Sequence, residues 1–128
     1  MNITEYAIQE LAKNIKDLKT GKEWVALFDK YGAKDVYDEF GLPDVGKNNA
    51  QRPSKVEYIK ARLIKFNNTA CLRNIIVQIV SESPNIIERV NNLIKSEGYN
   101  VIYQDNQYIL LGDIRKDNHD NKQAEINA

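Results

Sequence analysis

The sequence predicts a mainly helical α+β domain with about five helices and a C-terminal two-stranded β-hairpin, which is also the element order of a winged-helix-like domain. Apolar residues recur at spacings of three and four up to Gly98, and the period changes to two after it. Polar caps and glycines stand where these periods break. With 128 residues, 42% hydrophobic and 28% charged, the chain has the size and composition of one globular domain.

The first two helices are expected between Thr4 and Gly32. Thr4 suits the N-cap of the first helix, and Gly21 is expected just beyond its end. Its apolar stripe consists of Ile8, Leu11, Ile15 and Leu18. A short second helix over residues 24–31 carries Trp24 and is expected to end at Gly32.

Three more helices are expected between Ser54 and Gly98. Ser54 and Glu57 match a capping box at the start of the third helix. Thr69 suits the cap of the fourth. Pro84 stands at the first position of the fifth, where its missing amide costs no hydrogen bond, and Gly98 ends that helix.

Residues 33–52 predict a long ordered loop, because glycines, Pro43 and an asparagine pair interrupt every longer period. One helical turn is expected at residues 35–40. Long loops of this kind are often binding loops, but this one could equally be a structural crossover held down by its apolar side chains. Those side chains are Val36, Tyr37, Phe40, Leu42 and Val45.

A β-hairpin is predicted from residues 99–104 and 107–111, with Asp105-Asn106 as a two-residue turn. In that register Ile102 faces Ile109 on one surface, while Val101 faces Leu110 and Tyr103 faces Tyr108 on the other. A lone hairpin is marginally stable, so one of its faces must lie on the helices.

The domain is expected to span residues 1–112, and the polar residues 113–128 are expected to be a tail or the start of a linker. The single cysteine, Cys71, cannot form an internal disulfide. The sequence shows neither a secretory leader nor a membrane-spanning stretch, so a cytoplasmic location is expected.

Charge is unevenly distributed along the chain although the net charge is zero. Residues 47–73 contain seven basic and one acidic residue, and both flanks are acidic. A cationic surface with an interleaved aromatic ring suits phosphate contacts, which predicts a nucleic-acid-binding face on the third helix and the loop before it. Its members are Lys47, Arg52, Lys55, Tyr58, Arg62 and Lys65. The alternative is a solvated helix face that the acidic flanks neutralise.

The sequence contains partial matches to catalytic motifs, but the residues around them do not fit the chemistry that each motif requires. Residues 41–48 nearly match a phosphate-binding loop, but Asn48 replaces the hydroxyl that holds magnesium, and Pro53 delays the following helix. The carboxylates at 35, 38, 39 and 44 read as turn and cap residues rather than a metal or acid–base site. The sequence therefore predicts no enzyme, cofactor or metal ion.

The pattern of aromatic and glycine positions resembles the N-terminal domains of AbiJ-type abortive-infection proteins. The resemblance covers most of residues 22–112. It is carried by these segments: Trp24 to Gly32, Asp35-Val36-Tyr37, Phe40 to Pro43, Lys55 to Asn67, Glu97 to Tyr99 and Gln107-Tyr108. It implies a sensor or adaptor in phage defence, placed before an effector such as a HEPN ribonuclease, and it supplies no catalytic residues. This chain ends soon after the module, so the effector would be absent, on another polypeptide, or beyond an excised domain.

Two functions are predicted. The first is a non-catalytic recognition module that binds an anionic partner, such as nucleic acid, through the cationic surface. The second is a protein-interaction or dimerisation module without nucleic-acid binding, with Ile102 and Ile109 on the outer face of the hairpin as its interface. An effector protein or domain and a second copy of the chain are therefore the expected protein partners.

Overall fold

Hydroxyl side chains cap the first four α-helices of the computed structural model, which describes residues 1–46 and 52–112. Each cap accepts a hydrogen bond from a backbone amide two or three residues further on, which satisfies a donor that the helix leaves unpaired. The helices are α1 (Glu5–Ile15), α2 (Gly21–Lys30), α3 (Lys55–Phe66) and α4 (Ala70–Glu82), capped by Thr4, Thr20, Ser54 and Thr69.

The boundary between α1 and α2 differs from the sequence prediction. α1 ends at Ile15, a 3₁₀ turn follows at Lys16–Leu18, and Gly21 is the first residue of α2 instead of the residue beyond α1. Thr20 and Glu23 form a full capping box that starts α2, a signal that the sequence contains and that our prediction missed.

The fifth helix begins and ends as predicted. Pro84 opens a 3₁₀ turn at Pro84–Ile86, and α5 (Ile87–Ile94) continues from it. A second 3₁₀ turn, Lys95–Glu97, leads to Gly98, whose φ of 97° ends the helical segment in the left-handed conformation.

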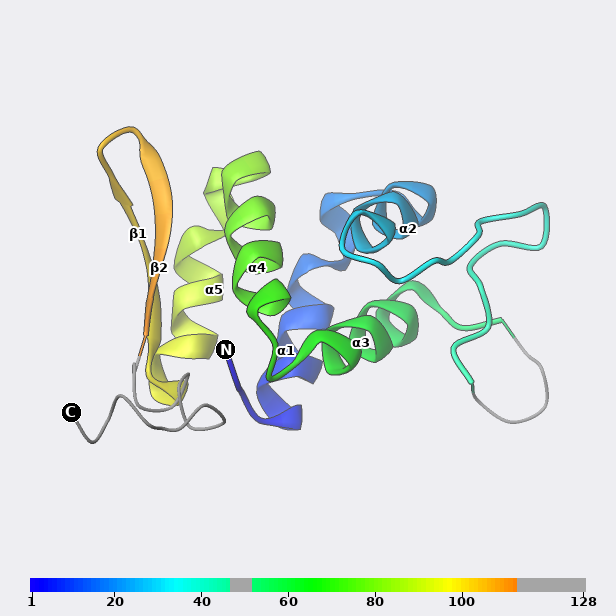
Figure 1. Cartoon of the computed structure of the whole chain (residues 1–128), viewed down its shortest axis with the longest axis horizontal. Helices are drawn as coiled ribbons and strands as arrows, with labels where there is room; N and C mark the ends of the chain where they lie inside the picture. Colours follow the sequence, from blue (N-terminus) through cyan, green and yellow to red (C-terminus); the bar gives the residue numbers. More distant parts are fainter. Residues whose placement is uncertain (47–51, 113–128) are drawn as a thin grey trace.

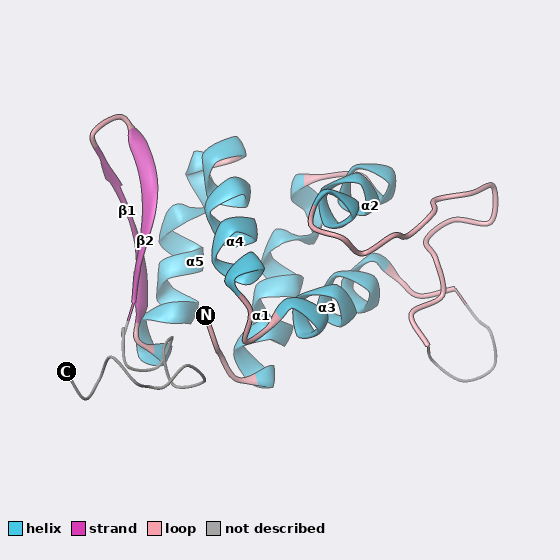
Figure 2. Cartoon of the chain, in the orientation of Figure 1, coloured by secondary structure: helices cyan, strands magenta, loops and turns pink. Residues whose placement is uncertain are grey.

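The C-terminal hairpin has the predicted strands and register. β1 (Tyr99–Gln104) pairs with β2 (Gln107–Gly112), and Ile102 lies opposite Ile109. Asp105 and Asn106 both have positive φ, at 54° and 64°, as a two-residue turn of this type requires. The fold is therefore mainly helical α+β with a C-terminal two-stranded antiparallel hairpin, as the sequence predicts (Figure 2).

The hairpin lies against α4 and α5 at one end of the molecule (Figure 1). Its inner face buries Tyr99, Val101 and Leu110. Two side chains reach its backbone from the helices: Asn91 of α5 exchanges two hydrogen bonds with Val101, and the guanidinium of Arg73 on α4 donates to the carbonyl of Leu110. Polar side chains thus fix the hairpin to the helices in addition to its apolar face.

The helices share one apolar core, in which aromatic rings join α2 to α3. Phe28 stacks on Trp24, meets the ring of Tyr58 edge-on and lies parallel to Phe66. None of the described helices is long and apolar enough to cross a membrane.

Residues 33–46 leave the helices at the end opposite the hairpin (Figure 1). The helical turn expected at residues 35–40 is absent: the amide of Gly41 donates to the carbonyl of Asp38 over 3.0 Å and closes a tight turn instead. Gly41 has a φ of 102°, which a glycine adopts without strain and which ends any helical continuation. Residues 47–51 and 113–128, and the tail expected there, lie outside the described part of the chain.

Candidate interaction surfaces

The predicted cationic face of α3 is occupied at its centre by a carboxylate from another segment. Asp35 accepts hydrogen bonds from Nε and Nη2 of Arg62 over 2.7 and 3.0 Å. The two side chains are only 8% and 15% exposed, so the pair lies almost out of water. Asp35 is further held by its own amide, which donates to the carboxylate of Asp29. Arg62 therefore holds the loop to the helix instead of presenting its charge to solvent.

Tyr58 does not lie on the surface, which corrects its assignment to the predicted nucleic-acid-binding face. Its side chain is fully buried against Phe28, and its hydroxyl donates to Oδ2 of Asp35 over 2.6 Å. Burial raises the pKa of the Tyr58 phenol above its ordinary value, and the hydrogen bond to Asp35 raises it further. Tyr58 is thus a core residue whose hydroxyl also bonds the carboxylate of the Asp35–Arg62 pair.

The other basic residues of the predicted nucleic-acid-binding face have different surroundings from those of Arg62. Arg52 donates to the carbonyl of Leu42 and pairs with Asp38 at 3.4 Å, and Nζ of Lys55 donates to the carbonyl of Lys19. Lys65 is exposed and makes no ion pair within the described residues. Lys47 lies outside the described residues.

Through Asp35, residues 33–46 reach the side of α3 that carries Tyr58 and Arg62. Tyr58 and Lys65 are seven residues apart and therefore project on the same side of the helix, yet one is buried and the other exposed. Phe28 of α2 packs on Tyr58, and Asp35 bonds its hydroxyl. The sequence contains no local signal that pairs Asp35 with Arg62, because 27 residues separate them.

Between Asp35 and Leu42, which both contact the helical body, residues 36–40 expose apolar side chains. Val36 and Phe40 are 69% and 68% exposed, and Tyr37 is partly exposed. The guanidinium of Arg52 lies over the Phe40 ring, 5.9 Å from its centroid. Leu42 packs against the core, as a crossover requires. Of the five side chains predicted to hold a crossover down, Leu42 and Val45 pack against the core, whereas Val36, Tyr37 and Phe40 are exposed, which corrects the prediction for these three.

Comparison of the chain with protein-family models, curated proteins and solved structures found no match.

The outer face of the hairpin is a second candidate surface. Ile102 and Ile109 are partly exposed and lie side by side across the two strands. Leu111, on the same face, is 49% exposed. Neither strand contains a charged residue or a proline. The two residues predicted as an interface therefore lie on one uncharged face, together with Leu111 and three amide side chains, opposite the face that packs on α4 and α5. The amides are Asn100, Gln104 and Gln107.

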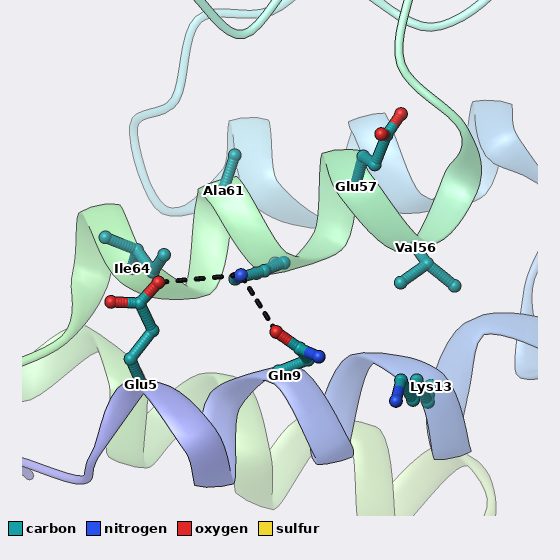
Figure 3. A pocket seen from close by; sticks show the side chains of 8 residues that line it. Glu5, Gln9, Lys13, Val56, Glu57, Ala61 and Ile64 are labelled. Carbon is teal, nitrogen blue, oxygen red and sulfur yellow. Dashed lines mark hydrogen bonds and ion pairs between the residues drawn. The ribbon is translucent and has the colours of Figure 1, made fainter. Parts of the chain in front are cut away.

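A surface groove runs between α1 and α3, with Val56, Ala61 and Ile64 on one side (Figure 3). Lys60 crosses it: its Nζ donates to the side chain of Gln9 over 3.0 Å and pairs with Glu5 at 3.5 Å. This bridge divides the groove between its Ile64 end and its Val56 end.

Three of the four carboxylates of residues 33–46, those of Asp35, Asp38 and Asp44, have structural partners. Asp35 and Asp38 pair with arginines, and Asp44 accepts from the amide of Gly46 over 2.9 Å in a local turn. Among the described residues, no three histidine, cysteine, aspartate or glutamate side chains gather into a metal-binding group.

Proposed function

We propose that this chain is a recognition module that contacts another protein through Val36, Tyr37 and Phe40. The observation that supports this proposal is the exposure of Phe40 in a segment that the Asp35–Arg62 pair holds in place. Aromatic side chains that are already ordered bind at low entropic cost, and they are frequent at the centres of protein interfaces.

The resemblance to AbiJ-type N-terminal domains supplies a class of partner. We propose that the module acts as a sensor or adaptor in a bacterial phage-defence system, and that its protein partner is the effector. The proposal assigns no catalytic residue to this chain.

The test places a photo-crosslinking amino acid at position 40 of the full chain, in cells that carry its gene. The control is the same substitution at Ile64, which is 44% exposed on α3. We expect one protein adduct specific to position 40. The purified partner should bind Phe40→Ser at least about tenfold more weakly than wild type, the loss typical of a hot-spot residue. Equal binding to the variant, or no adduct specific to position 40, would contradict the proposal.

Binding of an anionic partner such as nucleic acid is a second proposal, favoured by one observation. Lys65 remains exposed on the side of α3 that the sequence predicts to be cationic. Binding to single- or double-stranded DNA or RNA at low ionic strength, lost on Lys65→Glu and kept on Lys95→Glu, would support this proposal, since phosphate contacts weaken as salt rises. Lys95 is exposed beyond the end of α5 and has the same side chain, which makes it a matched control.

A further inference from the structure

Three hydrogen-bond donors on α3 converge on one carboxylate. The Tyr58 hydroxyl donates to Oδ2 of Asp35 over 2.6 Å, and Nε and Nη2 of Arg62 donate to Oδ2 and Oδ1 over 2.7 and 3.0 Å. A guanidinium edge matches the paired oxygens of a carboxylate or of a phosphate group, and the hydroxyl adds a third donor. The three donors therefore form an oxyanion site, which a carboxylate of the same chain fills.

The donors and the acceptor belong to parts of the fold that are held differently. Tyr58 and Arg62 lie about one turn apart on α3. The Tyr58 ring packs against Phe28, and the Arg62 guanidinium lies 5.6 Å from the centroid of that ring. Asp35 belongs to residues 33–46, which contain neither a helix nor a strand. The packing of α3 therefore keeps the donors together when Asp35 leaves them.

Two features next to Asp35 favour its departure. Lys34, directly before it, has a φ of 59°, a conformation in which the Cβ atom crowds the following carbonyl oxygen. The carboxylate of Asp29 accepts from the amide of Asp35 over 2.6 Å, which adds a like charge near Asp35. Both features lower the cost of exchanging Asp35 for another anion.

We propose that a phosphate monoester displaces Asp35 from Arg62 and Tyr58 and thereby releases residues 33–46. A free carboxylate offers the same two oxygens as Asp35, so it competes poorly with a carboxylate that is tethered to the chain. A phosphate monoester carries a charge of about −1.5 to −2 and three acceptor oxygens. The additional charge and the third oxygen favour phosphate in this competition.

An incoming phosphate can contact the site before Asp35 leaves. The Arg62 side chain is 15% exposed, and its hydrogen bonds to Asp35 do not involve Nη1. Lys65 follows Arg62 by three residues and is therefore its neighbour on the helix surface. It is exposed and makes no ion pair within residues 1–46 and 52–112. Nη1 and Lys65 thus supply two positive groups for a first contact.

The test is NMR of the full chain, titrated with sodium phosphate against sodium chloride of equal ionic strength. The pH is slightly alkaline, so that inorganic phosphate is mostly a dianion. The Arg62 Nε–H signal and the backbone amides of α3 report occupancy, and amide hydrogen exchange of residues 36–41 reports release.

Asp35→Ser removes the competing carboxylate and should show a saturable shift of these signals with phosphate. The wild type should need at least about tenfold more phosphate, because Asp35 must leave first. Exchange of residues 36–41 in the wild type should become faster along the same curve. Sodium acetate should bind Asp35→Ser more weakly than phosphate does.

The matched control is Glu39→Gln, which removes a carboxylate from an exposed position of the same segment and should respond as the wild type does. The α3 amides of Asp35→Ser/Arg62→Gln should not respond to phosphate. If Asp35→Ser fails to fold, as judged by circular dichroism, Asp35→Asn replaces it.

Four outcomes would overturn the proposal: no saturable shift in the Asp35 variant, equal phosphate dependence in that variant and the wild type, tighter binding by Glu39→Gln, or equal binding of acetate. A wild-type shift without faster exchange would show that phosphate binds and Asp35 stays, which also overturns it.

Release of residues 33–46 removes the ordered support of Phe40, so phosphate should weaken the proposed contact at residues 36–40. This consequence alone rests on the proposed function. The phosphate titration involves neither the crosslink at position 40 nor nucleic acid, so its failure and that of the proposed function are distinguishable.

Discussion

Asp35 and Arg62 form a two-point ion pair between residues 33–46 and α3, with Oδ2–Nε and Oδ1–Nη2 distances of 2.7 and 3.0 Å. The buried hydroxyl of Tyr58 donates to the same Oδ2. An arginine and a carboxylate in this geometry satisfy each other's hydrogen-bonding groups in parallel, which is the strongest form of such a pair. The contact holds the exposed Phe40 segment to the core, and it removes Arg62 from the predicted cationic surface.

Asp35→Ala should lower the free energy of unfolding by about 3 kcal/mol, because it leaves the nearly buried guanidinium of Arg62 without its partner. Urea unfolding at neutral pH measures this change. The control Lys13→Ala removes a cation from the exposed pair with Glu10 and should cost at most about 0.5 kcal/mol. Equal losses in the two variants would show that the Asp35–Arg62 pair contributes no more than a surface pair.

Tyr58 should make the protein sensitive to alkali. Its pKa is raised in the folded state, chiefly by burial, so folding opposes ionisation of the phenol. The resulting stability is complete below the ordinary tyrosine pKa of 10.0 and is lost as pH rises above it.

Tyr58→Phe should therefore be less stable than wild type at neutral pH, since it loses the hydrogen bond to Asp35, and should lose less of its remaining stability above pH 10. Free energies of unfolding measured at a series of alkaline pH values test this. Tyr103→Phe, which changes an exposed ring, should follow the wild-type curve. Parallel curves for wild type and Tyr58→Phe would contradict the prediction.

Asn91→Ala should destabilise the packing of the hairpin on α5 by about 2 kcal/mol. The side chain of Asn91 pairs with both the amide and the carbonyl of Val101, and its removal leaves both without this partner. The backbone amide hydrogen of Val101 should exchange with solvent faster in this variant than in the wild type. Asn92→Ala, at the exposed neighbouring position, should leave this exchange rate unchanged.

Gly112→Ala should cost about 1–3 kcal/mol, because a Cβ at this position would overlap the ring of Tyr99 in the facing strand. A double-mutant cycle with Tyr99→Ala checks the cause. If the overlap is responsible, the alanine at 112 should cost much less in the Tyr99→Ala background, whereas an unchanged cost would place the strain elsewhere.

Local chemistry accounts for the parts of the fold that the sequence predicts well. Ser54 and Thr69 cap the helices expected of them, and Pro84 and Gly98 bound the fifth helical segment. The hairpin register follows from Asp105-Asn106, because a two-residue turn with positive φ determines which residues face each other. The boundary at Gly21 was predicted incorrectly because glycine was read as a stop, while the Thr20–Glu23 capping box beside it starts α2.

The helices, the hairpin and the outer pair Ile102–Ile109 follow from the sequence, since caps, turns and side-chain periods act between residues close in the chain. The burial of Tyr58, the neutralisation of Arg62 and the exposure of Phe40 appear only once the chain is folded. Arg62 is neutralised by Asp35, which is 27 residues away, and Tyr58 is buried against Phe28 of α2. Composition or helical projection cannot show which side chains a distant segment covers.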